Sequence, residues 1–267
     1  MVRGQTGGWG GSVWFVPSVL QGWGLVGAIV VVCGVWQLLR AERFRAYRFL
    51  GVAFLLVVAA FAIGGGRTGY GAGAYPMVIA AGCVALTTMR GRWLRIAAGP
   101  VVVVSVVAAV VYTTPWRAAS EFSPAANRAA ALGPSVYSEG GWAELTAATV
   151  SAYRMLPATQ RGDAVVVTQW YVQAAALDHD REAAGLPAVF SPNRGFGYFG
   201  TPPDTARTVV YVGSDEQQLS RWFASVSPVG RMDYRLGIPG ITRDVTLWAC
   251  TGPRQDWSAQ WPRMRNL

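Results

Sequence analysis

Long apolar segments fill the first 116 residues, and they constrain the fold more than any other feature of the sequence. A helix that crosses the hydrocarbon core of a bilayer needs about 20 mostly apolar residues. It is apolar on all sides, whereas a helix on the surface of a soluble protein is apolar on one face. Four segments fit this description, at residues 13–39, 47–63, 70–89 and 96–114. We therefore predict an α-helical membrane region of about four transmembrane helices over residues 1–116.

Charged side chains divide the chain at the end of this region. Residues 1–116 contain nine arginines and one acidic residue, Glu42, whereas residues 117–267 contain fourteen arginines and thirteen acidic residues. The net charge of +9 could indicate nucleic-acid binding. Because the excess arginine lies beside apolar segments, it indicates membrane topology and lipid contact instead, with no nucleic-acid partner. We predict a multi-pass protein of the cell membrane with cytoplasmic loops at residues 40–48 and 90–95. Residues 117–267 are then extracytoplasmic.

The polar half alternates short apolar runs with helical patterns. Such alternation is typical of a small α/β domain with a partly parallel sheet. We predict a linker over residues 117–135 and an extracytoplasmic α/β domain over residues 136–267. The predicted helices cover residues 142–156, 171–184, 216–224 and 256–261, with the last one stopped by Pro262, and the predicted strands cover residues 163–169, 188–190, 208–212, 229–236 and 242–250.

Several motifs in the polar half fail the test of their chemistry. Residues 195–200 match the glycine pattern of dinucleotide-binding loops, but Pro202 and Pro203 follow where a helix should begin. His179 is the single histidine, and its neighbours Asp178 and Asp180 point away from it on a helix, so the three cannot share a metal ion. The prediction therefore includes no cofactor, no metal and no catalytic residue.

A glycine-rich stretch at residues 64–71 separates the second and third apolar segments. It carries Arg67, with Tyr70 and Tyr75 close behind. A guanidinium in such a loop can hold a phosphate through two hydrogen bonds. It can equally extend to the water from a helix end, with the tyrosines in the aromatic belt of the membrane. The residues alone leave both interpretations open.

This stretch and its surroundings resemble the late spans of the family 39 glycosyltransferases. That membrane group includes the protein O-mannosyltransferases and the lipid A aminoarabinose transferase, and the likeness is closest to its bacterial, mostly uncharacterised branch. The resemblance covers nearly the whole chain. Its main pieces are residues 47–53, Gly65-Gly66-Arg67, Tyr70, Ala72 to Pro76, residues 80–82 and 84–86, then residues 141–142, 174–178, 185–187, 193–197 and 252–254, with Trp257 and residues 261–262.

The resemblance implies transfer of a sugar from a polyprenyl-phosphate donor to an acceptor outside the membrane. Arg67 takes the position of the loop's basic residue, which faces the donor phosphate, and Tyr70 and Tyr75 match aromatic substrate-binding positions. The chain departs from the family pattern because arginine replaces lysine and Thr68-Gly69 replaces a proline–tyrosine pair.

The family's catalytic acid lies in an outer loop upstream of this region, whereas Glu42 is the only acid before Glu121. We therefore expect a truncated, C-terminal portion of such an enzyme, inactive alone and completed by a separate N-terminal half. The alternative is a non-enzymatic, membrane-anchored module that binds a glycan or a protein. Its candidate rings, which could stack on sugars or fill the core, are Trp170, Phe196, Tyr198 and Phe199.

Overall fold

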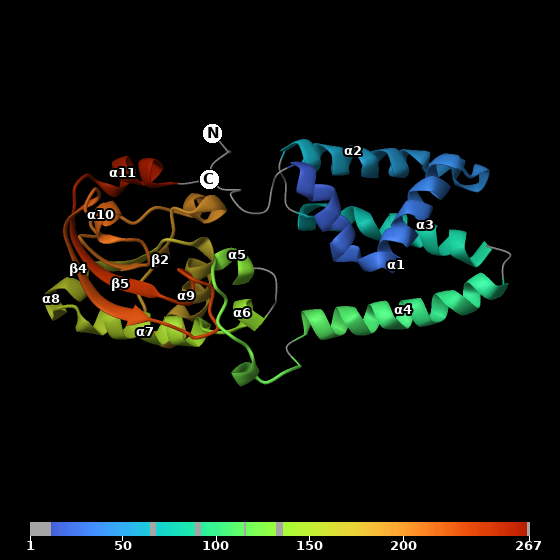
Figure 1. The fold of residues 1–267 in the computed structure, drawn as a ribbon. Coiled ribbons are helices and arrows are strands. Elements are labelled where there is room, and N and C mark those ends of the chain that lie inside the picture. The colour runs from blue at the N-terminus through green and yellow to red at the C-terminus, as the bar shows by residue number, and fades with distance from the viewer. Residues whose placement is uncertain (1–11, 65–67, 89–91, 115, 132–135, 266–267) are drawn as a thin grey trace. The chain divides into compact units, whose positions relative to one another are not determined.

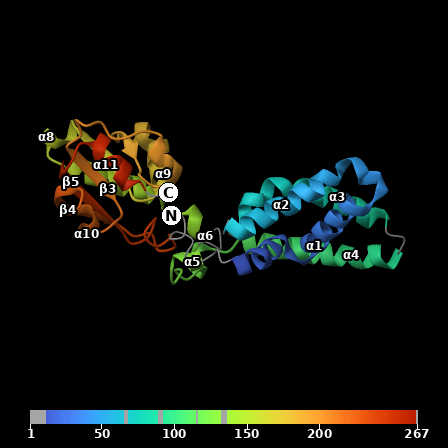
Figure 2. The ribbon, with the colours of Figure 1, turned by 90° about the horizontal axis from the view of Figure 1, so that it is seen from above.

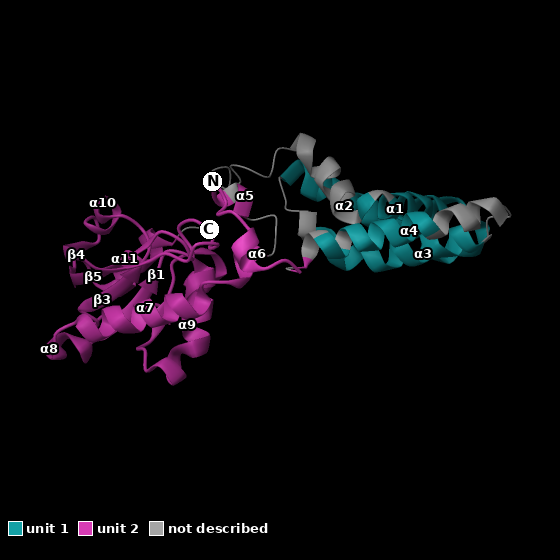
Figure 3. Ribbon diagram, turned by 60° about the horizontal axis from the view of Figure 1, so that its bottom comes forward, with its two compact units in different colours: residues 1–113 teal, residues 114–267 magenta. Residues whose placement is uncertain are grey.

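The computed structural model describes residues 12–64, 68–88, 92–114, 116–131 and 136–265. The chain divides into two compact units, residues 1–113 (unit 1) and 114–267 (unit 2), which are coloured separately in Figure 3. Each unit has its own packed interior.

Unit 1 consists of helices joined by short connections (Figure 1). Apolar side chains favour this arrangement because each helix satisfies its backbone hydrogen bonds internally. A small core forms where α1, α2 and α3 meet, around Val31, Phe54 and Val78. The described elements are α1 (Ser12–Arg40), η1 (Glu42–Tyr47), α2 (Arg48–Gly64), η2 (Thr68–Ala74), α3 (Tyr75–Thr88) and α4 (Arg92–Thr113).

Two glycines let α1 and α3 cross with their backbones in contact. A β-carbon added to Gly34 would lie 1.9 Å from the carbonyl oxygen of Val78. In the reciprocal position, a β-carbon on Gly82 would lie 2.0 Å from the carbonyl oxygen of Val30. Only glycine fits at such distances, and small residues at helix crossings are typical of packing in an apolar solvent.

The prediction of about four transmembrane helices is wrong. Among the described residues, one helix, Glu42–Gly64, is long and apolar enough to cross a membrane, with 23 residues and a mean hydropathy of 2.2. It joins η1 to α2. Two other apolar helices, Val26–Arg40 and Gly71–Thr87, are shorter, at 10–17 residues.

The backbone explains why the first and third segments fall short. Gly24 takes the non-helical angles φ 64° and ψ 175°, which break the first segment into two pieces. The third segment begins as the 3-10 helix η2, and α3 itself has 14 residues. Such a helix is about 21 Å long, against about 30 Å of hydrocarbon. The fourth segment forms α4, which contains Pro100. The side chains of α4 before Pro100 lie outside the described residues.

Unit 2 is built on a five-stranded mixed sheet with the order β2-β1-β3-β5-β4. β1 is parallel to β2 and β3, whereas β5 is antiparallel to β3 and β4. The central strands are valine-rich and buried on both faces, as expected for strands covered by helices. The strands are β1 (Ala164–Thr168), β2 (Val189–Phe190), β3 (Thr208–Val212), β4 (Phe223–Met232) and β5 (Val245–Pro253).

Alternate residues of β1 and β3 supply two separate cores. Val166 and Val210 pack on the face covered by α7 (Trp142–Met155) and α9 (Tyr171–Ala184). Val167 and Val209 pack on the opposite face, under α10 (Glu216–Leu219) and α11 (Trp257–Met264). Figure 2 shows α11 lying over the strands. The remaining short helices of unit 2 are η3 (Ala119–Glu121), α5 (Arg128–Ala131), α6 (Val136–Glu139), α8 (Ala158–Arg161) and η4 (Arg194–Tyr198).

Most predicted elements of unit 2 are confirmed, and the errors lie near its C-terminal end. The helix expected over residues 216–224 stops at Leu219, because pairing with β5 draws the chain from Phe223 onward into β4. The last helix continues through Pro262. Its turn is held by burial of Trp257 and Trp261, which outweighs the backbone hydrogen bond that proline cannot donate.

Arginine side chains hold residues 119–128, near the start of unit 2, against the rest of that unit. Arg235 donates hydrogen bonds to the carbonyl oxygens of Ala119 and Phe122, and Arg243 donates to that of Ala125 at 2.6 Å. In the other direction, Arg128 donates to the carbonyl oxygen of Pro239 at 3.0 Å. Small residues made residues 117–135 resemble a linker, but the described part of this stretch is held by side chains more than a hundred positions away.

Candidate functional site

The three residues expected to meet the sugar donor are only partly described. Arg67 lies outside the described residues, and so does the side chain of Tyr70, whose backbone is in η2. Tyr75 is the first residue of α3 and is half-buried. The structure therefore gives the surroundings of Tyr75 and leaves the roles of Arg67 and Tyr70 as predictions.

Tyr75 connects the glycine-rich stretch to the apolar helix Glu42–Gly64. Its ring packs edge-on against Phe54 of α2, with 6.3 Å between the ring centroids. Its hydroxyl oxygen lies 3.2 Å from the point that a β-carbon on Gly71 would occupy. The chain thus turns back along α2 after Gly64, and a side chain larger than glycine at position 71 would press on the tyrosine.

A second aromatic group lies in unit 2, on the loop of residues 193–200, which we call the aromatic loop. Tyr198 and Phe199 project into solvent, with 62% and 82% of their surfaces exposed. Phe196 instead packs against the core and meets Phe199 edge-on, with 5.4 Å between the centroids. The loop follows β2 and is held by Trp261, whose indole N–H donates to the carbonyl oxygen of Gly197 at 3.1 Å.

Two guanidinium groups lie over rings of this region. The Arg194 carbon Cζ is 5.6 Å from the centroid of the Tyr171 ring, and that of Arg265 is 4.7 Å from the Tyr198 ring. Such contacts are attractive because the face of the ring carries negative charge. Among the described residues, neither arginine takes part in an ion pair. Sequence reasoning missed Arg265 because nothing local connects it to a loop near position 198.

Trp170 is not part of an exposed platform. Arg128 lies over its ring at 4.4 Å, and the ring packs beside a small buried cluster at Ile238 and Ile241. Partial burial there lowers the pKa of Arg128, which remains a cation at neutral pH. Of the four rings that could stack on sugars, the structure therefore leaves Tyr198 and Phe199 accessible, whereas Trp170 and Phe196 help to fill the interior.

The carboxyl ends of β1 and β3 would be the usual ligand position in an open α/β sheet. Here Gln169 occupies it. Its side-chain oxygen accepts a hydrogen bond of 2.8 Å from the backbone N–H of Ser214. A β-carbon on Gly213 would lie 2.9 Å from the same oxygen. The space between the two strand ends is thus filled by the protein itself.

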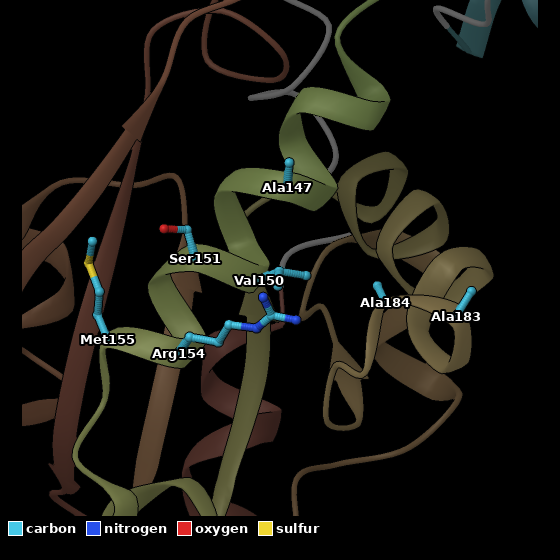
Figure 4. A pocket seen from close by; sticks show the side chains of 7 residues that line it. All are labelled: Ala147, Val150, Ser151, Arg154, Met155, Ala183 and Ala184. Carbon is cyan, nitrogen blue, oxygen red and sulfur yellow. The ribbon is translucent and has the colours of Figure 1, made fainter.

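A shallow groove runs between α7 and α9 (Figure 4). Its walls are mainly small apolar side chains, and Arg154 is its one charged residue. It offers no carboxylate or histidine that could act as a base. The lining residues are Ala147, Val150, Ser151, Arg154, Met155, Ala183 and Ala184.

The acidic residues beside His179 serve other partners. Asp180 accepts a hydrogen bond of 3.1 Å from the hydroxyl of Thr146, and Asp178 pairs with Arg181 at 3.4 Å. Within the described residues, no group of three histidine, cysteine or acidic side chains is placed to hold a metal ion.

No protein-family model, curated protein or solved structure matches this chain.

Proposed function

We propose that the chain carries the donor-binding loop and the outer domain of a family 39-type membrane glycosyltransferase, which transfers a sugar from a polyprenyl-phosphate donor to an acceptor outside the membrane. One observation supports this proposal above others. The apolar helix Glu42–Gly64 ends three residues before Arg67, and beyond the loop Tyr75 packs back onto Phe54 of the same helix.

An apolar helix beside a basic loop suits the chemistry of this donor. A polyprenyl chain needs hydrocarbon around it, and only 11% of the most apolar window of Glu42–Gly64 is buried within the protein. Phe49, Leu56 and Ile63 extend outward from it. The phosphate of the donor lies at the water interface, where a guanidinium at the helix end can form two charge-assisted hydrogen bonds with it.

We assign donor binding, and no other step of the reaction, to these residues. Glu42 is the only acidic residue before Glu121. Its carboxylate lies 3.2 Å from the guanidinium of Arg48, at the opposite end of the helix from Gly64. A general base for transfer therefore has no candidate in unit 1, and we propose no proton-transfer role for it.

Binding of a polyprenyl phosphate by the full chain in lipid nanodiscs tests the proposal. Arg67→Gln should weaken binding by about 10- to 150-fold, since a charge-assisted hydrogen bond contributes about 1.5–3 kcal/mol. Arg67→Lys, which keeps the charge, should retain most of the affinity. Arg45→Gln is the matched control, because Arg45 is an exposed arginine of η1 beyond the other end of α2.

Two results would contradict donor binding at Arg67. One is equal affinity of the wild type and Arg67→Gln. The other is equal affinity of the full chain for a polyprenyl phosphate and for the corresponding alcohol, which lacks the phosphate.

A further inference from the structure

We infer that the aromatic loop docks onto the membrane surface, with Tyr198 and Phe199 among the lipid headgroups and with Arg194 and Arg265 against lipid phosphates. This inference rests on the proposed function, which attaches the chain to a bilayer. It adds a second, separate contact with the lipid, made by unit 2.

Exposure of the two rings is the first argument. A phenyl ring with 82% of its surface in contact with water gains almost nothing from folding. Most other large apolar side chains of unit 2 are buried in its two cores. Exposed aromatic side chains on a loop are typical of proteins that insert into the headgroup layer, where one end of the ring is apolar and the other wet.

The loop presents these rings on a fixed backbone. The hydrogen bond from Trp261 to Gly197 holds its centre, and the side-chain oxygen of Asn193 accepts a bond of 3.3 Å from the backbone N–H of Tyr171. Phe190, just before the loop, packs edge-on against Trp261 with 6.3 Å between the centroids. Little conformational entropy remains to be lost on docking, which favours binding by a small patch.

Charge complementarity is the third argument. Arg265 lies over the ring of Tyr198, whereas Arg194 belongs to the same loop and lies over the ring of Tyr171. No acidic residue occurs between Glu182 and Asp204. Basic residues beside an anionic leaflet contribute attraction that is additive to the burial of apolar surface. The patch therefore matches the two properties of a lipid surface, an apolar layer beneath a layer of phosphates.

A soluble sugar fits the same patch less well. Sugars stack on an open ring face beside polar groups, but Arg265 covers one face of Tyr198 and Arg194 lies over Tyr171. Asn193, the amide side chain of the loop, is buried. We therefore commit to lipid as the occupant, and binding of an oligosaccharide becomes an outcome of the test.

The experiment places a photoreactive benzoylphenylalanine at position 199 of the full chain in vesicles of phosphatidylcholine and phosphatidylglycerol. Position 155 carries the same group as the control, because Met155 is also a strongly exposed apolar residue, with 65% of its surface accessible. Met155 precedes β1, whereas the aromatic loop follows β2. The two positions therefore lie toward opposite ends of these parallel strands.

We expect strong cross-linking to lipid at position 199 and little at position 155. Arg194→Gln or Arg265→Gln should each reduce the lipid adduct at position 199 about fivefold, and omission of phosphatidylglycerol should reduce it further. Equal lipid adducts at the two positions would overturn the inference. Loss of the adduct at position 199 on addition of a soluble oligosaccharide would overturn it too, in favour of a sugar-binding surface.

Extraction of the vesicles with alkaline carbonate separates this inference from the proposed function. If the full chain leaves the vesicles, the membrane attachment assumed by the proposed function fails. If the chain stays and position 199 does not cross-link, docking of the aromatic loop fails and the proposed function stands.

Discussion

Units 1 and 2 are both held together by close packing, but they achieve it in opposite ways. In unit 1, α1 and α3 meet through the absence of side chains at Gly34 and Gly82. In unit 2, large side chains such as Phe223 and Trp257 fill the space between the sheet and α11. The outer surfaces differ as well, since unit 1 leaves large apolar residues such as Leu56 and Val104 exposed.

The two ways of packing respond differently to the same kind of substitution. In water, burial of large apolar side chains is the main favourable term. In hydrocarbon that term is absent, and helices associate when small residues let their backbones approach. A substitution to alanine should therefore destabilise unit 2 by removing atoms and unit 1 by adding them.

The largest effect is expected in the core of unit 2. Phe223 is completely buried, with its ring centroid 5.9 Å from that of Trp257. Phe223→Ala should lower the free energy of unfolding by about 3–5 kcal/mol, because it leaves a cavity. Urea unfolding of the full chain in detergent, followed by near-ultraviolet circular dichroism, measures this. Met155→Ala is the exposed control, and an equal loss in both variants would contradict a core role for Phe223.

The opposite substitution should destabilise unit 1. Gly34→Ala places a methyl group 1.9 Å from the carbonyl oxygen of Val78, so α1 and α3 must separate. Overpacking of this kind costs about 1–3 kcal/mol. The control is Gly64→Ala, since a β-carbon there meets nothing within 4 Å. Thermal denaturation in detergent compares the two, and an unchanged melting temperature for Gly34→Ala would remove the proposed contrast between the units.

Alkaline pH should weaken unit 2 through a buried thiol. Burial raises the pKa of Cys250 from 9.0 to about 12. Between these values the unfolded chain loses a proton that the folded chain keeps, so stability is full below pH 9.0 and falls as pH rises, by about 1.4 kcal/mol per pH unit. Burial also raises the pKa of Tyr211, and this adds to the slope.

Urea unfolding at several pH values between 8 and 11 tests this linkage. Cys250→Ala should reduce the dependence of the free energy of unfolding on pH, leaving mainly the part due to Tyr211. Cys250 is buried whereas Cys83 is exposed. Cys83→Ala, the matched control, should leave the slope unchanged. A slope that Cys250→Ala does not alter would exclude the thiol as its source.

The smallest effect concerns the start of unit 2. Arg235→Ala removes the donors that hold the carbonyl oxygens of Ala119 and Phe122. The bonds are exposed, so the loss should be about 1 kcal/mol. Cleavage by trypsin after Arg117 should become faster, whereas Arg221→Ala, which alters another exposed arginine, should not change it. Equal cleavage in both variants would show that the segment is held by other contacts.

Local patterns predicted the sheet of unit 2 better than the helices of unit 1. The valine runs at β1 and β3 are short, flanked by turns and apolar on both faces, so they allow one structure. Apolar composition in unit 1 allows several, since a kink at Gly24 or a 3-10 turn at η2 keeps the same hydropathy while shortening the helix. Counting apolar residues therefore overestimated the number of spanning helices.

The candidate functional residues divide in the same way. The sequence left open whether Tyr198 and Phe199 face solvent or fill the core, and the structure exposes both. The partial burial of Trp170 could not be predicted, because the residue that covers it, Arg128, lies 42 positions upstream. Arg265 over Tyr198 was missed for the same reason.

By itself, the sequence determined the separation into an apolar and a mixed unit and the alternation of strands and helices in unit 2. These features depend on composition and on periodicity within a few residues. The tertiary structure decided the crossing at Gly34 and Gly82, the filling of the strand ends by Gln169, and the hold of Arg235 on the segment after unit 1. Each of these depends on two groups that are distant in sequence, and their meeting is fixed only when the whole chain packs.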